Sequence, residues 1–254
     1  MTSPHLVKVI AYEENDNGSN FLDSNEPCNP FIMMECIHGT TLENFLRKRT
    51  RNATSPSFNI TPQTLYIAYS VVSALHYLHK KKLVHRDVKP ANIYLTRVNE
   101  DTIPSEVKLG DFGIVKWGDF KASITSGTLT ATGQLNLGTL KYMSPEQALN
   151  PREVDVRSDI YSLGITLFEL FTNQILPNIF HVYRLTNQRS RRKNTLSRLH
   201  ELGLGMIPNE FEDLFTHIYD MFASAPSSRP SSVDMVGRLQ YLLDSAGHSH
   251  LFTY

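Results

Sequence analysis

Two short motifs near the middle of the chain, and the distance between them, constrain this sequence more than any other feature. The first is His85-Arg86-Asp87-Val88-Lys89-Pro90-Ala91-Asn92, and the second, Asp111-Phe112-Gly113, begins 24 residues after Asp87. An Asp-Phe-Gly tripeptide alone is weak, because a turn explains it most simply. The order and spacing of the two motifs are far more informative, and they contribute carboxylate and amide oxygens, the hard donors that Mg²⁺ prefers.

Three further motifs follow in the rest of the chain. Ser144-Pro145-Glu146 ends a long stretch rich in Thr, Ser and Gly, residues 159–164 open an apolar helix, and Arg229-Pro230 lies near the C-terminus. Five motifs in this order match the signature of the protein kinases. The sequence therefore resembles the eukaryotic protein kinases over residues 4–243. A lysine at this place in Asp-x-Lys-Pro-x-Asn resembles the motif of the Ser/Thr branch of that family.

The resemblance implies a fold and a reaction. The implied fold is α+β and protein-kinase-like, with a mostly α-helical large lobe and only the last strands of the small lobe. The reaction is transfer of the ATP γ-phosphate to protein serine or threonine, for which the protein mainly positions groups and neutralises charge. Asp87 would orient the substrate hydroxyl, and Lys89 would contact ATP at the transferred phosphate. Asn92 and Asp111 would bind Mg²⁺ and, with it, the nucleotide.

The same resemblance places the adenine-binding hinge in an early apolar segment. Glu35 and Ile37 would bind adenine through their backbone groups, and Met34 would be the gatekeeper. Core packing is an equally good explanation for Met34 and its neighbour Met33, because a methionine pair on a strand is ordinary.

Other matched residues are expected to support the site rather than to take part in the chemistry. By resemblance, His85 and Phe112 pack in the internal hydrophobic spine, and Asp159 anchors the backbone of the catalytic loop. Glu146 and Arg229 would form an ion pair, which specifies geometry more than it stabilises.

Parts of the kinase signature are missing from the sequence. No Gly-rich loop precedes the hinge. The motif Val-Ala-Ile-Lys is also absent, and Lys8 is the only lysine in a similar apolar setting. We interpret Leu6–Tyr12 as the fourth strand of the small lobe. This divides the chain into a small-lobe remnant with the hinge, residues 1–37, and a large lobe, residues 38–254. The chain is either a fragment of a longer protein or a natural truncated homologue, and both alternatives stay open.

Periodicity and capping residues predict the remaining elements. Thr41 is expected to cap a helix with Leu42, Phe45 and Leu46 on one face, followed by a loop over 47–59. The other predicted elements are helices over 61–81, 159–171, 210–222 and 232–243, and strands over 31–35, 83–84, 93–95 and 107–109.

Three stretches, residues 31–43, 92–95 and 132–147, resemble the kinases of the alpha subunit of translation initiation factor 2. The resemblance implies that subunit as protein substrate, stress-linked control of translation, and dimerisation through the small lobe. Residues 194–202, beside the basic cluster 189–193, would form a helix that docks the substrate; the alternative is an ordinary amphipathic helix that covers the lobe, beside a solvated basic loop. Other Ser/Thr kinases stay open, as does a second class of function, a catalytically impaired lobe that only binds partners.

Regulation is expected in the polar loop over 114–143. Arg86 would pair with a phosphate on this loop, because the guanidinium fork matches phosphate oxygens. Thr130 and Thr132 are the candidate phosphorylation sites. Thr139 is expected to support the catalytic loop, although it could also be modified.

Composition narrows the class of partner. Twenty-five basic and twenty-five acidic residues cancel, which argues against direct nucleic-acid binding. The most apolar segment, residues 160–171, is too short to cross a bilayer and contains Glu169, so no membrane span is expected in this segment. Two cysteines and no visible secretory signal favour a reducing, cytoplasmic location.

Overall fold

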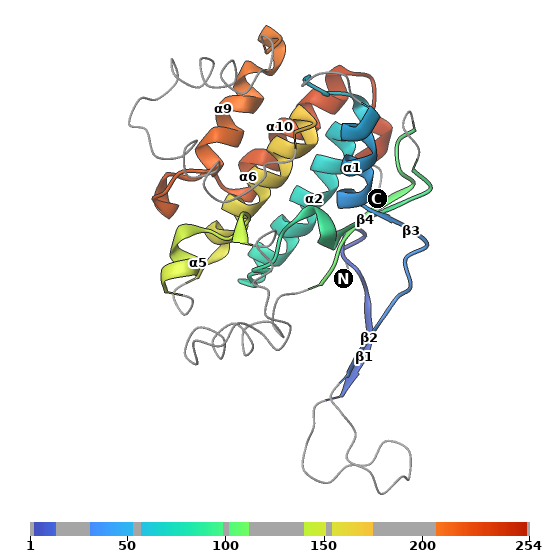
Figure 1. Ribbon diagram of the computed structural model, residues 1–254, viewed down its shortest axis with the longest axis vertical. Coiled ribbons are helices and arrows are strands. Elements are labelled where there is room, and N and C mark those ends of the chain that lie inside the picture. The colour runs from blue at the N-terminus through green and yellow to red at the C-terminus, as the bar shows by residue number, and fades with distance from the viewer. Residues whose placement is uncertain are drawn as a thin grey trace, which may run out of the picture.

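A computed structural model describes residues 3–13, 31–52, 57–98, 102–111, 140–150, 154–174 and 207–252 (Figure 1). These residues form a helical body, a small three-stranded sheet beside it, and a two-stranded ribbon that extends away from it. The described part is mostly helical with short sheets, which agrees with the α+β prediction. The predicted division at residue 37 stays a prediction.

Four helices that pack against one another make up the centre of the body. They are α2 (Pro62–Lys80), α6 (Val156–Thr172), α9 (Glu212–Met221) and α10 (Ser232–Ser245). Helix α2 packs against both α10 and α6, and α6 packs against α9. Every residue of α6 from Ser158 to Thr172 is buried, and Phe168 and Phe171 make edge contacts with Phe222 and Phe215. The predicted apolar helix is therefore the centre of the core.

The start of each central helix is fixed by its own sequence. Thr61 caps α2 in a reciprocal capping box with Thr64, and Pro62 occupies the first helical position, where no amide hydrogen is needed. The carboxylate of Asp155 caps α6 by accepting a hydrogen bond from the Arg157 amide. These caps hold the two helices that position the site.

Short strands and turns complete the body. Strands β3 (Gly39–Thr41), β4 (Ile93–Thr96) and β5 (Glu106–Leu109) form an antiparallel sheet with β4 in the centre. The remaining helical elements are α1 (Leu42–Asn52), α5 (Pro145–Leu149), and the 3-10 turns η1 (Pro90–Asn92), η3 (Asn209–Phe211), η4 (Pro226–Ser228) and η5 (Ser249–Phe252). Side chains alternate along β4, so that Ile93 and Leu95 are buried under the helices whereas Tyr94 faces the other side.

The ribbon consists of β1 (Val9–Glu13) and β2 (Phe31–Met34), which pair antiparallel. Just before β1, the chain is hydrogen-bonded to β5, where the Val7 amide donates to the Leu109 carbonyl at 2.9 Å. Ile32, Met33 and Met34 are each at least 40% exposed. Core packing is therefore wrong as an explanation of the methionine pair.

The segment after the Thr41 cap differs in part from the prediction. The loop predicted from Arg47 is helical as far as Asn52, because Arg47 pairs with Glu43 one turn earlier and Thr50 Oγ1 donates to the Leu46 carbonyl. The Thr41 cap itself is confirmed, since its Oγ1 accepts from the Asn44 amide at 3.2 Å. The short strand β3 was not predicted.

Residues 83–84 are not a strand. The chain leaves α2 through Lys82, which has a positive φ of 59°, and the Leu83 amide donates back to the Leu78 carbonyl. This closes the C-terminus of α2 and turns the chain directly into the catalytic loop, with Leu83 exposed.

Candidate active site

Asp159 of α6 anchors the loop that follows α2. Its two carboxylate oxygens accept hydrogen bonds from the backbone amides of His85 and Arg86, each at 2.8 Å. The Nε2 atom of His79, at the end of α2, lies 3.0 Å from the same carboxylate. The side chain of Asp159 is completely buried, so these contacts compensate for removing a carboxylate from water. The anchoring role predicted for Asp159 is confirmed.

Asp87, Lys89 and Asn92 come together at the end of this loop. The Lys89 ammonium lies 2.9 Å from Asp87 Oδ1. The Asn92 amide nitrogen donates to Asp87 Oδ2 at 2.9 Å and to the Asp87 carbonyl at 2.7 Å. All three side chains are largely buried within the body, so the Asp87 carboxylate is held in one orientation. Their catalytic and binding roles stay predictions.

His85 connects this loop to the end of β5. Its Nε2 lies 3.0 Å from the Gly110 carbonyl, and its Nδ1 accepts from the Asp87 amide at 3.3 Å. An amide only donates and a carbonyl only accepts, so these partners require the neutral tautomer protonated at Nε2. Burial lowers the pKa of His85, although Asp159 acts in the opposite direction, which agrees with a neutral ring.

Asp111 directly follows this point in a left-handed backbone conformation, with a φ of +57°. Aspartate adopts this conformation more readily than most residues other than glycine and asparagine. Gly110 is needed before it, because a Cβ there would lie 2.7 Å from a Val7 methyl group. The hydroxyl of Tyr94 donates to Asp111 Oδ2 at 3.1 Å. Burial, then the neighbouring Asp111 carboxylate, raises the pKa of Tyr94, so its phenol stays a donor at neutral pH.

The predicted hinge lies beside the same sheet. The Lys108 ammonium of β5 binds both carboxylate oxygens of Glu35, at 2.6 and 2.8 Å. The Glu35 amide donates to the Lys8 carbonyl at 3.0 Å, and the Lys8 amide donates to Glu35 Oε1 at 2.8 Å. The hydrogen bonds from Lys108 are the main reason why the pKa of Glu35 is lowered. These contacts bring the segment Glu35–Ile37 next to the strand that leads to Asp111.

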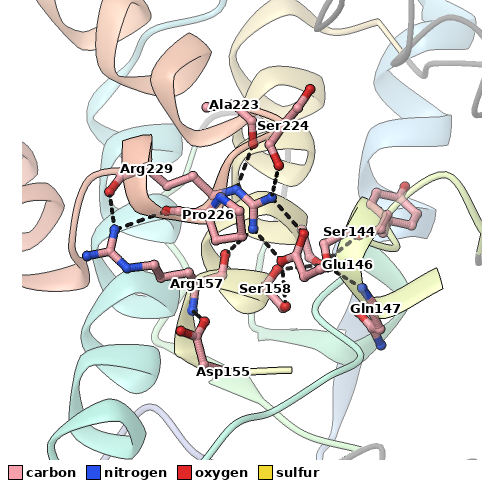
Figure 2. Close-up of polar contacts among 12 residues, drawn as sticks. Ser144, Glu146, Gln147, Asp155, Arg157, Ser158, Ala223, Ser224, Pro226 and Arg229 are labelled. Atoms are coloured by element: carbon pink, nitrogen blue, oxygen red, sulfur yellow. Dashed lines mark hydrogen bonds and ion pairs between the residues drawn. The ribbon is translucent and has the colours of Figure 1, made fainter. Parts of the chain in front are cut away.

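Helix α5 is bonded to Arg229, between α9 and α10 (Figure 2), and also to the loop that Asp159 anchors. Arg229 binds both oxygens of Glu146, at 2.6 and 2.8 Å, and Ser158 donates to Glu146 Oε1 at 2.7 Å. This confirms the predicted ion pair. The Gln147 side chain donates to the Arg86 carbonyl at 2.9 Å. The segment that closes the polar loop is therefore bonded directly to the catalytic loop.

Several predicted residues lie outside the described ranges. They are Phe112, Gly113, Thr130, Thr132, Thr139, the basic cluster 189–193 and the docking segment 194–202. Sequence reasoning in turn missed His79, Tyr94 and Lys108. Of these three, only Lys108 could have been noticed in the sequence, because it alternates with the apolar residues Val107 and Leu109 on a predicted strand.

Comparison with known protein families identifies the family of this chain. The family model described as the protein kinase domain matches residues 1–241. The chain belongs to the protein kinase domain family.

Bacterial serine/threonine kinases are among the curated relatives of this chain. The "Probable serine/threonine-protein kinase SCO3848" of Streptomyces coelicolor is 37% identical over 169 residues, 66% of this chain and 21% of that protein. Serine/threonine-protein kinase PknF of Mycobacterium tuberculosis is 36% identical over 169 residues, 66% of this chain and 30% of its own length. PknB of Mycobacterium leprae is 37% identical over 145 residues, 57% and 20% respectively.

The chain thus spans between a fifth and three tenths of the length of these relatives. Among the described residues, no helix is both long and apolar enough to cross a membrane. The same residues contain no cluster of three or more His, Cys, Asp or Glu side chains placed to hold a metal ion.

Proposed function

We propose that this chain acts in a protein serine/threonine kinase that transfers the γ-phosphate of ATP to protein hydroxyl groups. The observation that carries this proposal is the fixed Asp87 carboxylate, held by Lys89 and by Asn92 on a loop that Asp159 anchors. A group that orients a nucleophile must be held precisely, and rigid helices and buried hydrogen bonds achieve that here. Serine/threonine kinases among the relatives support the same reaction.

The residues fit a magnesium ion. Both hydrogen bonds of the Asn92 amide nitrogen go to oxygens of Asp87, which identifies the other amide atom, Oδ1, as the one able to face a cation. Together with the Asp111 carboxylate it forms a pair of hard oxygen donors. Proteins usually hold Mg²⁺ by one or two such groups plus substrate phosphates. When bound, this ion would neutralise charge on the phosphates.

The other residues have separate roles in the proposal. Asp87 accepts or orients the proton of the substrate hydroxyl, and Lys89 stabilises charge on the transferred phosphate. The backbone of Glu35 and Ile37 binds adenine. The sequence contains no Gly-rich loop or Val-Ala-Ile-Lys lysine, so we expect the isolated chain to bind ATP weakly and transfer phosphate slowly.

Two substitutions test these roles in the purified chain or in a longer protein that contains it. Asp87→Asn should reduce phosphate transfer at least about 10²-fold and leave Mg-ADP affinity nearly unchanged, since it removes a proton acceptor. Asp111→Asn should instead weaken Mg-dependent nucleotide binding. Asp155→Asn is the control, because asparagine caps α6 as well as aspartate does.

Calorimetry with Mg-ADP and a radiolabel transfer assay provide the two measurements. Equal loss of nucleotide affinity in the Asp87 and Asp111 variants would contradict the division of roles.

The finer proposal is that the alpha subunit of translation initiation factor 2 is the substrate and that the kinase acts in the cytoplasm under stress. The resemblance of residues 31–43, 92–95 and 132–147 to that branch supports it. Substituting Arg198 or Glu201 in the docking segment should reduce phosphorylation of this subunit but spare a short generic peptide. Equal effects on both substrates would contradict it.

Regulation and assembly complete the proposal. Phosphate on Thr130 or Thr132, paired with Arg86, would switch activity, and Thr139 would support the loop. Mass spectrometry of cellular protein should find phosphate between residues 123 and 139, and its absence would count against the switch. Dimerisation would use the small lobe.

The alternative function is a non-catalytic lobe that binds partners. It is distinguished by transfer activity, because four intact groups at Asp87, Lys89, Asn92 and Asp111 have no chemical use in a lobe that only binds. Undetectable transfer by a longer protein containing both a Gly-rich loop and this chain would favour the binding module.

A further inference from the structure

The face of the three-stranded sheet that points away from the helices carries a hydrogen bond to the proposed metal ligand. Tyr94 lies in the central strand β4, opposite Thr41 of β3 and Lys108 of β5. Its two neighbours along the strand, Ile93 and Leu95, are fully buried on the other face. Tyr94 therefore has a rigid base, because the strand that carries it is bonded on both sides and anchored beneath.

The Tyr94 ring is directed towards Asp111 by its packing. The ring lies close to Gly110, where a Cβ atom would come within 3.0 Å of Tyr94 Cε2. From this position the hydroxyl reaches Asp111 Oδ2 at 3.1 Å. Asp111 is exposed, so burial does not fix the orientation of its carboxylate.

We propose that Tyr94 is a positioning residue that orients the Asp111 carboxylate for Mg²⁺ through its hydroxyl group. This inference rests on the proposed function and deepens it. A carboxylate has about four lone-pair positions on its two oxygens, and the phenol uses one of them on Oδ2. Oδ1 and the other position on Oδ2 remain for a cation. The hydroxyl can therefore stay bonded while the carboxylate binds metal.

The expected size of the effect follows from similar arrangements around metals. Removing a group that hydrogen-bonds a metal ligand commonly costs 10- to 100-fold in metal affinity. The Tyr94–Asp111 bond is partly open to water, so we expect the lower end of that range, about tenfold. Tyr94 is assigned a positioning role in this proposal, not a catalytic one, because its hydroxyl acts through the Asp111 carboxylate.

Tyr94→Phe removes one oxygen atom and keeps the ring, which makes it the sharpest test. ADP binding is measured by calorimetry over a range of Mg²⁺ concentrations and again in EDTA. The variant should need about tenfold more Mg²⁺ for half of the metal-dependent gain in affinity. Its ADP affinity in EDTA should be unchanged, because the ring surface is preserved. Tyr241→Phe, at a tyrosine that is 70% exposed on α10, is the matched control and should change neither value.

The outcomes separate this inference from the proposed function. If Asp111→Asn abolishes the Mg²⁺ dependence while Tyr94→Phe matches the unaltered chain, the positioning role is wrong and the kinase proposal stands. A lower Mg²⁺ requirement in Tyr94→Phe would also overturn it, since the phenol would then compete with the metal. If Tyr94→Phe lowers the affinity for ADP equally with Mg²⁺ and in EDTA, Tyr94 only packs against its neighbours, and the positioning role is wrong. The titrations are repeated in a longer protein that contains this chain and a Gly-rich loop. If that protein binds neither ADP nor Mg²⁺, the proposed function fails, and this inference fails with it.

Discussion

The helical body and the β1–β2 ribbon both contain apolar sequences, but they bury them to different extents. In α6, every side chain from Ser158 to Thr172 is buried. In the ribbon, Val9, Ile10, Ile32, Met33 and Met34 are between 40% and 58% exposed. The body has α2 and α9 against α6, whereas each strand of the ribbon has only the other as a partner among the described residues.

This difference follows from what each region can bury. A helix that is apolar on most faces needs partners around it, and the body supplies them. Two strands without a third partner are marginally stable in water, so their side chains contribute little to the free energy of folding. The proposed catalytic residues Asp87 and Lys89 belong to the first region, and the proposed hinge residues Glu35 and Ile37 directly follow the second. We therefore expect the proposed catalytic residues to be held more rigidly than the proposed hinge.

The largest effect should come from breaking the anchor of the catalytic loop. Asp159→Ala leaves the amides of His85 and Arg86 buried without their acceptor, which should lower the free energy of unfolding by about 3–5 kcal/mol. Asp155→Ala is the matched control, because it removes the same side chain from the exposed N-cap of the same helix. That variant should cost only about 1 kcal/mol. Urea unfolding gives both values, and similar losses would contradict the anchoring argument.

A matched pair of isoleucines tests the comparison itself. Ile160→Ala creates a cavity in the body and should lower the free energy of unfolding by about 2–4 kcal/mol. The same substitution at Ile10, which is 58% exposed in the ribbon, should cost less than about 0.5 kcal/mol. Denaturation of the two variants under one set of conditions measures the difference. If Ile10→Ala is as costly as Ile160→Ala, the ribbon is part of the folded core.

Acid should weaken the body through the Glu146–Arg229 pair. Burial raises the pKa of Glu146, but the hydrogen bonds from Arg229 and Ser158 outweigh it and lower the value to about 2. Because the folded pKa lies below the unfolded one, this stabilisation is present above about pH 4.5 and is lost as pH falls towards 2.

The loss should be on the order of 1–2 kcal/mol, after a discount for the partial exposure of this carboxylate. Comparing the unfolding of the unaltered chain and Glu146→Gln between pH 6 and pH 3 tests this. A difference between the two proteins that does not narrow with acid would count against it.

Local chemistry explains which elements were predictable. The α2 helix was predicted almost to the residue, because Thr61, Pro62 and the apolar periodicity all favour the same start and face. The ion pair Glu146–Arg229 and the anchor Asp159 were predicted from family motifs, and the structure confirms both. These regions could be predicted because capping residues, apolar periodicity and family motifs favour the same structure.

Contacts across the sheet could not be predicted from sequence. Nothing near Tyr94 in the sequence indicates Asp111, since the two meet only when β4 pairs with β5 and Gly110 turns the chain. Lys108 and Glu35 are likewise 73 positions apart. The extension of α1 through its basic residues was missed for another reason: charged side chains on an exposed helical face resemble a loop in composition.

The smallest effect concerns the ion pair that joins the ribbon to the sheet. Lys108→Met removes the ammonium that binds both oxygens of Glu35 but keeps the length of the side chain. Partly exposed pairs contribute about 0.2–1 kcal/mol, so global stability should hardly change. The local effect should be measurable at the Glu35 amide, which donates to the Lys8 carbonyl.

Hydrogen exchange at that amide should become about two- to fivefold faster, because the contact that holds Glu35 against β5 is gone. Lys80→Met, at an exposed lysine in the last turn of α2, removes the same charge elsewhere and should leave exchange at Glu35 unchanged. Exchange within α6 should stay the same in both variants, since no contact of that helix is altered. If exchange in α6 accelerates together with that of Glu35, then the ribbon and the body unfold as one unit, and the distinction between a rigid catalytic region and a looser hinge is wrong.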